Sequence, residues 1–212
     1  MLVNELKNIF KDLKEIDIGK YSYLKYPKFL PMMKMKVKSY SLANFGSIMV
    51  METSMMKMMK LTTISFTPSS GINVPFLLID TMSMGKKRIA FIEFYNTTDE
   101  KYLSLELLKE KYQNIEDYQE KEAWYVNERM KGSLIKCSTS KEENLLLEMI
   151  KDALTQYKNI IDNASYNENN INKLKEFSSR MINEGNPSSK TLNKVLGKQE
   201  AEIFFKKIVM PL

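Results

Sequence analysis

The spacing of hydrophobic positions predicts helices at both ends of the chain. Apolar residues recur every three or four positions, which is typical of one face of an amphipathic helix. Four segments show this pattern: residues 2–16, 143–161, 171–183 and 188–208. Gly197 interrupts the last of them, and the Asn-rich stretch at 163–172 predicts a surface loop.

The middle of the chain instead alternates apolar and polar residues, as half-buried strands do; Met35 and Val37, for example, stand between lysines. Strands are expected at residues 34–40, 46–52, 60–67, 74–81, 87–95 and 131–137. Their short spacing, with turn signals at Gly71 and Gly85, favours an antiparallel meander. We therefore expect an α+β fold, a three-layer α/β/α sandwich with a central antiparallel sheet flanked by helices on both faces, as a single domain over residues 1–212.

Composition is that of an ordinary globular protein, with 43% hydrophobic residues in 212. No apolar run approaches the roughly 20 residues that a membrane span needs. The N-terminal segment is charged throughout and has no signal-peptide core. The single cysteine, Cys137, cannot form an intrachain disulfide and is expected to be buried and inert. These features predict a cytoplasmic protein without a membrane partner.

The chain has no histidine, which excludes whole classes of site. Serine and cysteine triads, imidazole zinc sites and histidine-ligated haem all need that side chain. One cysteine cannot ligate an iron–sulfur cluster, and neither GxGxxG nor GxxxxGK[ST] occurs. No metal site is expected, so any catalysis must rest on carboxylates, hydroxyls, lysines or a bound organic molecule.

The net charge of +6 comes from 29 lysines and three arginines. Such a surface attracts acidic partners over long range. Neither an aromatic-basic RNA-binding signature nor a helix-turn-helix glycine pattern is present, so nucleic acid is not the expected partner. An acidic protein and an acidic small molecule both remain open.

Asp80 is the residue that the sequence marks most clearly for proton chemistry. It follows the apolar run Val74–Ile79, and burial of a carboxylate raises its pKa toward neutrality. The alternative is that Asp80 only begins a turn before Gly85. Nine methionines lie between Met32 and Met59; they either line a pocket for a flat, polarizable ligand or fill an ordinary core.

Several strings, in order along the chain, carry a family resemblance. Thr67-Pro68, Pro75 and Asp80 stand where a Phe-Pro turn, a second proline and a central acid stand in the ferredoxin-dependent bilin reductases, the phycocyanobilin and phytochromobilin synthases. Trp124 and Lys136, in Leu-Ile-Lys-Cys-Ser, resemble that family's Trp and its Phe-Ile-Arg-Pro-Ser strand. The segment at 190–197 and the apolar residues after it resemble the family's Arg-Val-Leu-Glu-Lys-Ala-Phe-Gly segment and last helix.

The resemblance, which covers about residues 30–212, implies a substrate and a mechanism. Members hold a linear tetrapyrrole between the sheet and the C-terminal helices. They reduce it by one-electron transfers from reduced ferredoxin, coupled to protonation, without metal or flavin. Asp80 matches the acid that protonates the bilin. Glu52 matches a second carboxylate if the preceding turn is one residue shorter; it shares a strand side with Val50, and it either faces the pocket or is exposed at a strand end.

Departures from the family pattern alter this expectation. Thr63 stands at the family's histidine, Asn186 at its C-terminal aspartate, and Lys136 at the arginine that binds a propionate. Lysine keeps that charge but loses the bidentate geometry. The departures imply a different regiochemistry, a different bilin or lost activity. Trp124 is either part of the bilin site or a core residue.

The leading interpretation is a bilin reductase whose Asp80, and secondarily Glu52, donate protons, with ferredoxin or flavodoxin as the electron donor and no bound cofactor. The alternative is a non-catalytic bilin- or tetrapyrrole-binding protein on the same fold, and a third possibility is an unrelated α/β binding module. Because those donors are acidic, exposed lysines would guide them to the site. The candidates near predicted strand ends are Lys57, Lys60, Lys86 and Lys87.

Overall fold

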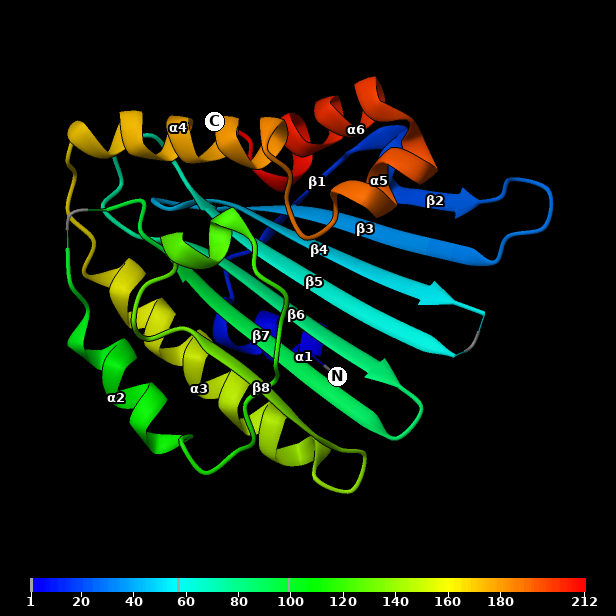
Figure 1. Ribbon diagram of the computed structural model, residues 1–212. Helices are drawn as coiled ribbons and strands as arrows, with labels where there is room; N and C mark the ends of the chain where they lie inside the picture. Colours follow the sequence, from blue (N-terminus) through cyan, green and yellow to red (C-terminus); the bar gives the residue numbers. More distant parts are fainter. Residues whose placement is uncertain (1, 57, 99) are drawn as a thin grey trace.

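The computed structural model describes residues 2–56, 58–98 and 100–212, and its centre is an eight-stranded antiparallel sheet (Figure 1). The sheet order is β1-β3-β4-β5-β6-β7-β8, and β2 also pairs with β3. The strands are β1 (Lys14–Ile16), β2 (Tyr23–Tyr26), β3 (Met33–Leu42), β4 (Gly46–Met55), β5 (Met59–Pro68), β6 (Phe76–Met84), β7 (Lys87–Tyr95) and β8 (Leu134–Thr139). From β3 to β8 each strand pairs with the next along the chain, so the predicted antiparallel meander is confirmed.

Six α-helices and three short helical turns accompany the sheet in the described residues. The helices are α1 (Leu2–Ile9), α2 (Leu103–Lys111), α3 (Glu143–Asp162), α4 (Asn169–Asn183), α5 (Ser189–Leu196) and α6 (Lys198–Phe204). The turns are η1 (Gly19–Ser22), η2 (Trp124–Glu128) and the π-helical η3 (Phe205–Val209). Among the described residues, no helix combines the length and apolar character needed to cross a bilayer.

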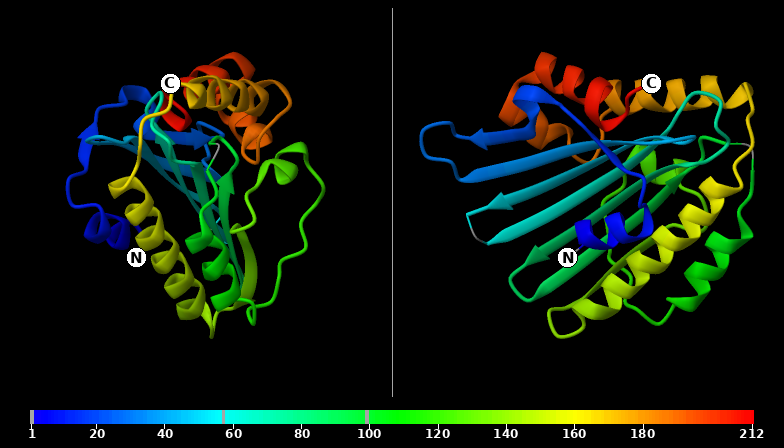
Figure 2. Two further views of the ribbon diagram at one scale, coloured as in Figure 1. Left: turned by 90° about the vertical axis from the view of Figure 1, so that its left-hand side faces the viewer. Right: turned by 180° about the vertical axis from the view of Figure 1, so that it is seen from behind.

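Alternation along the strands sends side chains to two faces with different covers (Figure 2). On one face, Val50, Ile64 and Ile79 pack with α1, α2 and α3. On the other, Met49, Met51 and other apolar residues pack with α4, α5, α6 and η3. We call the second the Asp80 face, because Asp80 points to that side, and the first the reverse face.

The C-terminal helices are tied to the Asp80 face by hydrogen bonds as well as by packing. The hydroxyls of Ser65 and Thr67, two residues apart on β5, both donate to the carbonyl oxygen of Val209, at 3.0 Å each. Both hydroxyls are buried, so they need this acceptor. The π-helical turn η3 therefore has a fixed position over the middle of the sheet.

Three expectations from the hydrophobic pattern are wrong. The helix predicted over 2–16 ends at Ile9, because residues 14–16 pair with β3 as the edge strand β1. The Asn-rich connector at 163–172 is shorter than expected, since α4 already begins at Asn169. The pattern also missed α2, whose leucines do not keep a single helical spacing, and β2, which is only four residues long.

Candidate functional site

Asp80 lies inside strand β6, four residues before the strand ends at Met84. It pairs with Thr63 on β5 and with Phe91 on β7, so these residues and Met51 on β4 form one cross-strand row on the Asp80 face. The interpretation of Asp80 as the start of a turn is wrong, because the chain turns only at Gly85.

The environment of Asp80 raises its pKa into the range useful for proton transfer. The residue is only 8% exposed, and burial raises the pKa of its carboxyl to about 6. The Thr63 hydroxyl opposes this shift by donating a hydrogen bond to Oδ1 of Asp80. Thr63, the residue that the sequence resemblance aligned with a histidine, therefore contacts the candidate acid directly.

A second buried carboxylate, Glu93, lies close to Asp80 and was missed in the sequence. Glu93 pairs with Leu78, two residues before Asp80, so the two acids are diagonal neighbours on one face of paired strands. Glu93 is 1% exposed, and burial raises its pKa to about 7 although Arg129 opposes the shift. The negative charge of Asp80 contributes to this rise in the pKa of Glu93.

Glu93 is held by a fixed set of donors. Arg129 donates from Nε (2.8 Å) and from Nη2 to Oε1 of Glu93, and the Tyr95 hydroxyl donates to the same oxygen at 2.9 Å. Arg129 also forms hydrogen bonds with both carboxylate oxygens of Glu120. One guanidinium is thus shared between two carboxylates, so the positive charge of Arg129 compensates the negative charge of an ionised Glu93 only in part.

The signal that would have identified Glu93 is the one that singled out Asp80. Glu93 stands in the string Phe91-Ile92-Glu93-Phe94-Tyr95, an otherwise apolar run inside a correctly predicted strand. A carboxylate within such a run is buried at a cost unless it is paired, protonated or both.

Glu52 does not join this site. It pairs with Thr62 and Lys36 on the reverse face, whereas Met51 occupies the row of Thr63 and Asp80. Glu52 is exposed and lines a surface groove of about 490 Å³ together with Lys34, Lys36 and Lys60. Its predicted match to a family carboxylate required the preceding turn, which lies between β3 and β4, to be one residue shorter. The observed pairing of β4 places Glu52 on the reverse face.

Lys136 also lies away from Asp80. It pairs with Ala90 on the reverse face, is 3% exposed, and donates to the carbonyl oxygen of Ile115 at 2.9 Å. It also forms an ion pair with Asp117 at 2.7 Å. The side chain is therefore fully engaged behind the sheet, and its placement does not support a propionate-binding role on the Asp80 face.

Asn186 and Trp124 lie on the Asp80 face as parts of its cover. Asn186 donates from Nδ2 to the carbonyl of Met181 and accepts from the backbone of Ser188, both at 3.0 Å, which closes the loop between α4 and α5. Trp124 donates from Nε1 to the carbonyl of Gly185 at 2.8 Å and is half-buried against the core. Both residues hold the loop at 184–188 in place.

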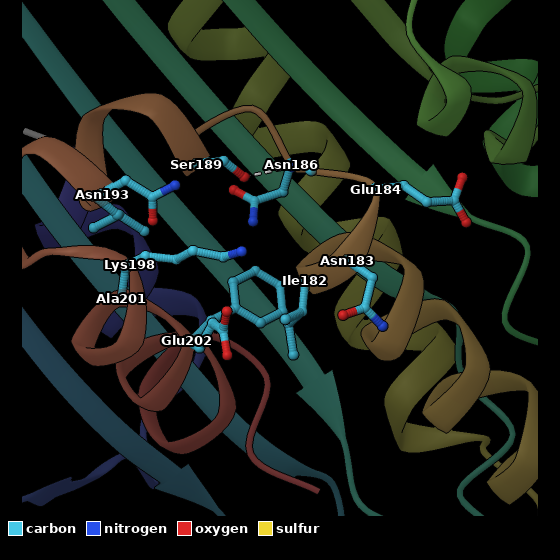
Figure 3. A pocket seen from close by; sticks show the side chains of 12 residues that line it. Ile182, Asn183, Glu184, Asn186, Ser189, Asn193, Lys198, Ala201 and Glu202 are labelled. Atoms are coloured by element: carbon cyan, nitrogen blue, oxygen red, sulfur yellow. Dashed lines mark hydrogen bonds between the residues drawn. The ribbon is translucent and has the colours of Figure 1, made fainter.

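Two cavities meet at this loop. The larger, about 210 Å³, opens outward between α4, α5 and α6, where Lys198 and Glu202 extend from α6 near Asn186 (Figure 3). The smaller, about 20 Å³, lies beneath it against Met51 and Thr63 and has room for about one water. Asn186, Leu192 and Phe205 line both cavities and separate them.

Beyond Asp80, the end of the sheet where β4 and β6 finish is uncovered by helices on both faces (Figures 1 and 2). We call it the open end. On the Asp80 face its cross-strand rows carry apolar side chains that are partly or fully exposed: Leu61 and Met82 in one row, beside the buried Thr53, and Met55, Met59 and Met84 in the next, beside the exposed Lys87. An uncovered apolar surface next to buried acids is typical of a site for a large apolar ligand.

The remaining predicted residues also have defined positions. Cys137 is buried, and burial raises the pKa of its thiol, as expected for an unreactive cysteine. Lys60, Lys86 and Lys87 are exposed at the open end, while Lys57 lies outside the described residues. No three His, Cys, Asp or Glu side chains gather as metal ligands in the described part of the chain.

Comparison with known proteins gives a fold and no family. No protein-family model matches the sequence, and no curated protein does. Solved structures do match: the crystal structure of phytochromobilin synthase from tomato in complex with biliverdin aligns with a TM-score of 0.79. The alignment covers 98% of this chain and 80% of that chain, at 11% sequence identity. The likeness establishes the fold alone. It agrees with the resemblance read from the local strings, which also pointed to a phytochromobilin-synthase-like protein.

Proposed function

We propose that this protein binds a linear tetrapyrrole on the Asp80 face and reduces it, with Asp80 as the proton donor. The observation that carries the proposal is the position of Asp80: a buried acid with a pKa of about 6, on the sheet face that the C-terminal helices cover. The shared fold with a phytochromobilin synthase solved with biliverdin supports it.

The chemistry requires little from the protein beyond binding and proton donation. Reduction of one double bond of a bilin takes up two electrons and two protons. The electrons come one at a time from an external carrier, and a general acid with a pKa near the working pH delivers a proton most effectively. Asp80 meets this requirement, and the Thr63 hydroxyl bonded to Oδ1 orients the carboxyl group.

The bilin would bind across the apolar row of Leu61 and Met82 and beneath the loop at 184–188. The small cavity there holds about 20 Å³, whereas ligand pockets typically measure about 300–1,000 Å³. Entry therefore requires that Asn186 and Leu192 move outward, which would join this cavity to the outer one of about 210 Å³. The methionines of the open end suit a flat, polarizable ligand because their side chains adapt to its shape.

We further propose that the electron carrier is an acidic protein of the ferredoxin or flavodoxin type. The lysines at the open end support this, because Lys34, Lys36 and Lys60 line one groove on the reverse face with a single carboxylate, Glu52. A carrier bound there would be separated from the bilin by the thickness of one sheet.

A non-catalytic bilin-binding protein is the second candidate function. The observations in its favour are Thr63 and Met51, which stand in the row of Asp80 and carry no titrating group. Without a second acid in this row, the protein would bind a bilin without completing its reduction.

One anaerobic experiment separates the two functions. Biliverdin is added to the protein and its absorption recorded, and reduced ferredoxin is then added. A shifted and sharpened bilin band that converts to a new product supports the reductase. A shifted band that stays unchanged supports the binding protein, and the absence of any shift would overturn both.

A further inference from the structure

The placement of two buried acids, Glu93 and Asp80, as diagonal neighbours on one face of the sheet points to a role for Glu93, which rests on the proposed reduction. Two protons are needed for each double bond, and Asp80 carries one. Thr63 and Met51, its neighbours in the row, have no proton to give near neutral pH. We propose that Glu93 is the second proton store of the site and passes its proton to Asp80 after Asp80 has donated its own.

The placement of the two acids allows this transfer. Diagonal neighbours on antiparallel strands have Cβ atoms roughly 7 Å apart, which a glutamate side chain spans directly or through one water. Both residues are more than nine-tenths buried on the same face. Glu93 is one row further under the helices, so a bilin over Asp80 reaches Glu93 only through Asp80. Glu93 therefore acts on the bilin only indirectly, by returning a proton to Asp80, and Asp80 is the catalytic acid.

The charges around Glu93 explain why it retains a proton. The groups that face it are Asp80 on β6, Tyr95 on β7, Arg129 and Glu120 in the segment around η2, and Tyr125 on η2 itself. Burial raises the pKa of the Tyr125 hydroxyl, with contributions from both Glu93 and Asp80, so this phenol is neutral and close to both acids.

With Tyr95 also neutral, the buried part of the cluster contains two carboxylates, Asp80 and Glu93, and one cation, Arg129, which also binds the exposed Glu120. Full ionisation would leave excess negative charge in a water-poor site, which is strongly disfavoured. Burial therefore favours the protonated form of both Asp80 and Glu93, so the pair can store two protons, and the two titrations are coupled.

With this assignment, all electrons and protons of the reaction are accounted for. Two one-electron transfers from the external carrier reduce the bilin double bond. Asp80 supplies the first proton to the bilin, Glu93 then reprotonates Asp80, and Asp80 supplies the second. Both carboxylates end ionised, and water restores their protons before the next turnover.

The test uses Glu93→Gln with Glu110→Gln as the matched control, because Glu110 is an exposed carboxylate on α2 that, in the described part of the chain, makes no hydrogen bond or ion pair with Arg129 or Asp80. Glu93→Gln is expected to bind biliverdin as tightly as the parent, to accept the first electron and proton, and to stop there. Turnover falls about 100-fold, and a radical signal accumulates in electron paramagnetic resonance. Glu110→Gln is expected to turn over at the parent rate without a trapped radical. Glu93→Asp restores turnover in part, since it keeps a carboxyl group.

Two further measurements keep the proposal testable if Glu93→Gln does not fold. Tyr95→Phe removes a donor that favours ionised Glu93, so it is expected to move the pH limb of turnover upward. Infrared titration of protonated carboxyl groups without bilin is expected to show two coupled protonations in the parent, and one in Asp80→Asn. Turnover and pH profile unchanged in Glu93→Gln or Tyr95→Phe, or one protonation in the parent, would overturn the role of Glu93. Absence of biliverdin binding by the parent would instead overturn the proposed function and leave the infrared result to stand by itself.

Discussion

At the level of single residues, the chemistry of the Asp80 face follows from burial against few compensating charges. Among the described residues, Asp80 receives one side-chain hydrogen bond, from the Thr63 hydroxyl, and no cation contributes to stabilising its charge. Glu93 has a cation, but Arg129 divides its hydrogen bonds between Glu93 and Glu120. Both acids therefore titrate close to neutral pH, which surface carboxylates do not do.

Replacing Asp80 by Asn should separate binding from chemistry. Asparagine keeps the size of the side chain and can accept the Thr63 hydrogen bond, but it has no proton to donate to the bilin. We expect the affinity for biliverdin to stay within about threefold of the parent and the turnover rate to fall by about 100-fold or more. Absorption titration measures the first, and anaerobic turnover with reduced ferredoxin the second. Full activity in this variant would remove Asp80 from the mechanism.

Asp80 should also leave a signature in the dependence of stability on pH. Its pKa is about 6 in the folded protein and about 4 when unfolded, so the folded state binds more protons between these values. The contribution of Asp80 to stability is therefore complete below about pH 4 and decreases as the pH rises to about 6, by at most about 3 kcal/mol.

Urea unfolding of the parent and of Asp80→Asn at several pH values measures this contribution. The difference in unfolding free energy between the two should change by that amount across pH 4–6 and stay constant above about pH 7. A difference that does not vary with pH would mean that folding leaves the pKa of Asp80 unchanged, which would contradict its burial as the cause of a raised pKa.

At the level of elements, strand register decides which residues share the site. The hairpin between β6 and β7 has two residues in its turn, Gly85 and Lys86, and pairs Met84 with Lys87. Gly85 has a φ of +57°, the conformation that such tight turns require. Counting back from this turn pairs Asp80 with Phe91 and Leu78 with Glu93. The proximity of the two acids could therefore have been predicted from the sequence.

The position of Glu52 was not accessible in the same way. The predicted strand ended at residue 52, whereas β4 continues to Met55 and pairs with β5 from Met59. A shift of one residue in the length of this connection moves every side chain of the strand to the other face. The alternation that grouped Glu52 with Val50 was correct, but Val50 belongs to the reverse face. The local sequence pattern therefore predicts the strand, but only its pairing with neighbouring strands decides which face of the sheet Glu52 occupies.

The placement of Glu52 gives a matched control for Asp80→Asn. Glu52→Gln changes an exposed carboxylate on the reverse face, so we expect turnover with a small diffusible reductant within about twofold of the parent. If Glu52→Gln instead slowed this turnover as strongly as Asp80→Asn, the register of β4 relative to Asp80 would be wrong. The readout is the same anaerobic absorption assay, with both variants compared at one pH.

At the level of the whole molecule, the open end of the sheet has two dissimilar faces. The Asp80 face there is apolar, with Leu61, Met59 and Met82 partly exposed. The reverse face has exposed lysines in register, with Lys36 in the row of Glu52 and Lys34 in the row of Lys60. The apolar face suits a large apolar ligand, and the lysine-rich face suits an acidic carrier. The net charge of +6 would guide that carrier toward the protein.

Replacing Lys34, Lys36 and Lys60 together by Gln tests the reverse face as the docking surface. Removing three positive charges from one groove weakens its attraction for an acidic carrier, so we expect reduction by ferredoxin to slow by about tenfold or more at low salt. The difference from the parent should shrink as ionic strength rises, because salt screens these charges.

The matched control is the triple Gln variant of Lys109, Lys175 and Lys190, which are exposed on α2, α4 and α5 and give the same change in net charge. It should retain most of the parent rate with ferredoxin, and both variants should match the parent with a small uncharged reductant. Equal slowing of the two triple variants would mean that net charge alone guides the carrier. Unchanged kinetics in the first variant would place the docking surface elsewhere, with Lys86 and Lys87 at the β6–β7 hairpin as the next residues to replace.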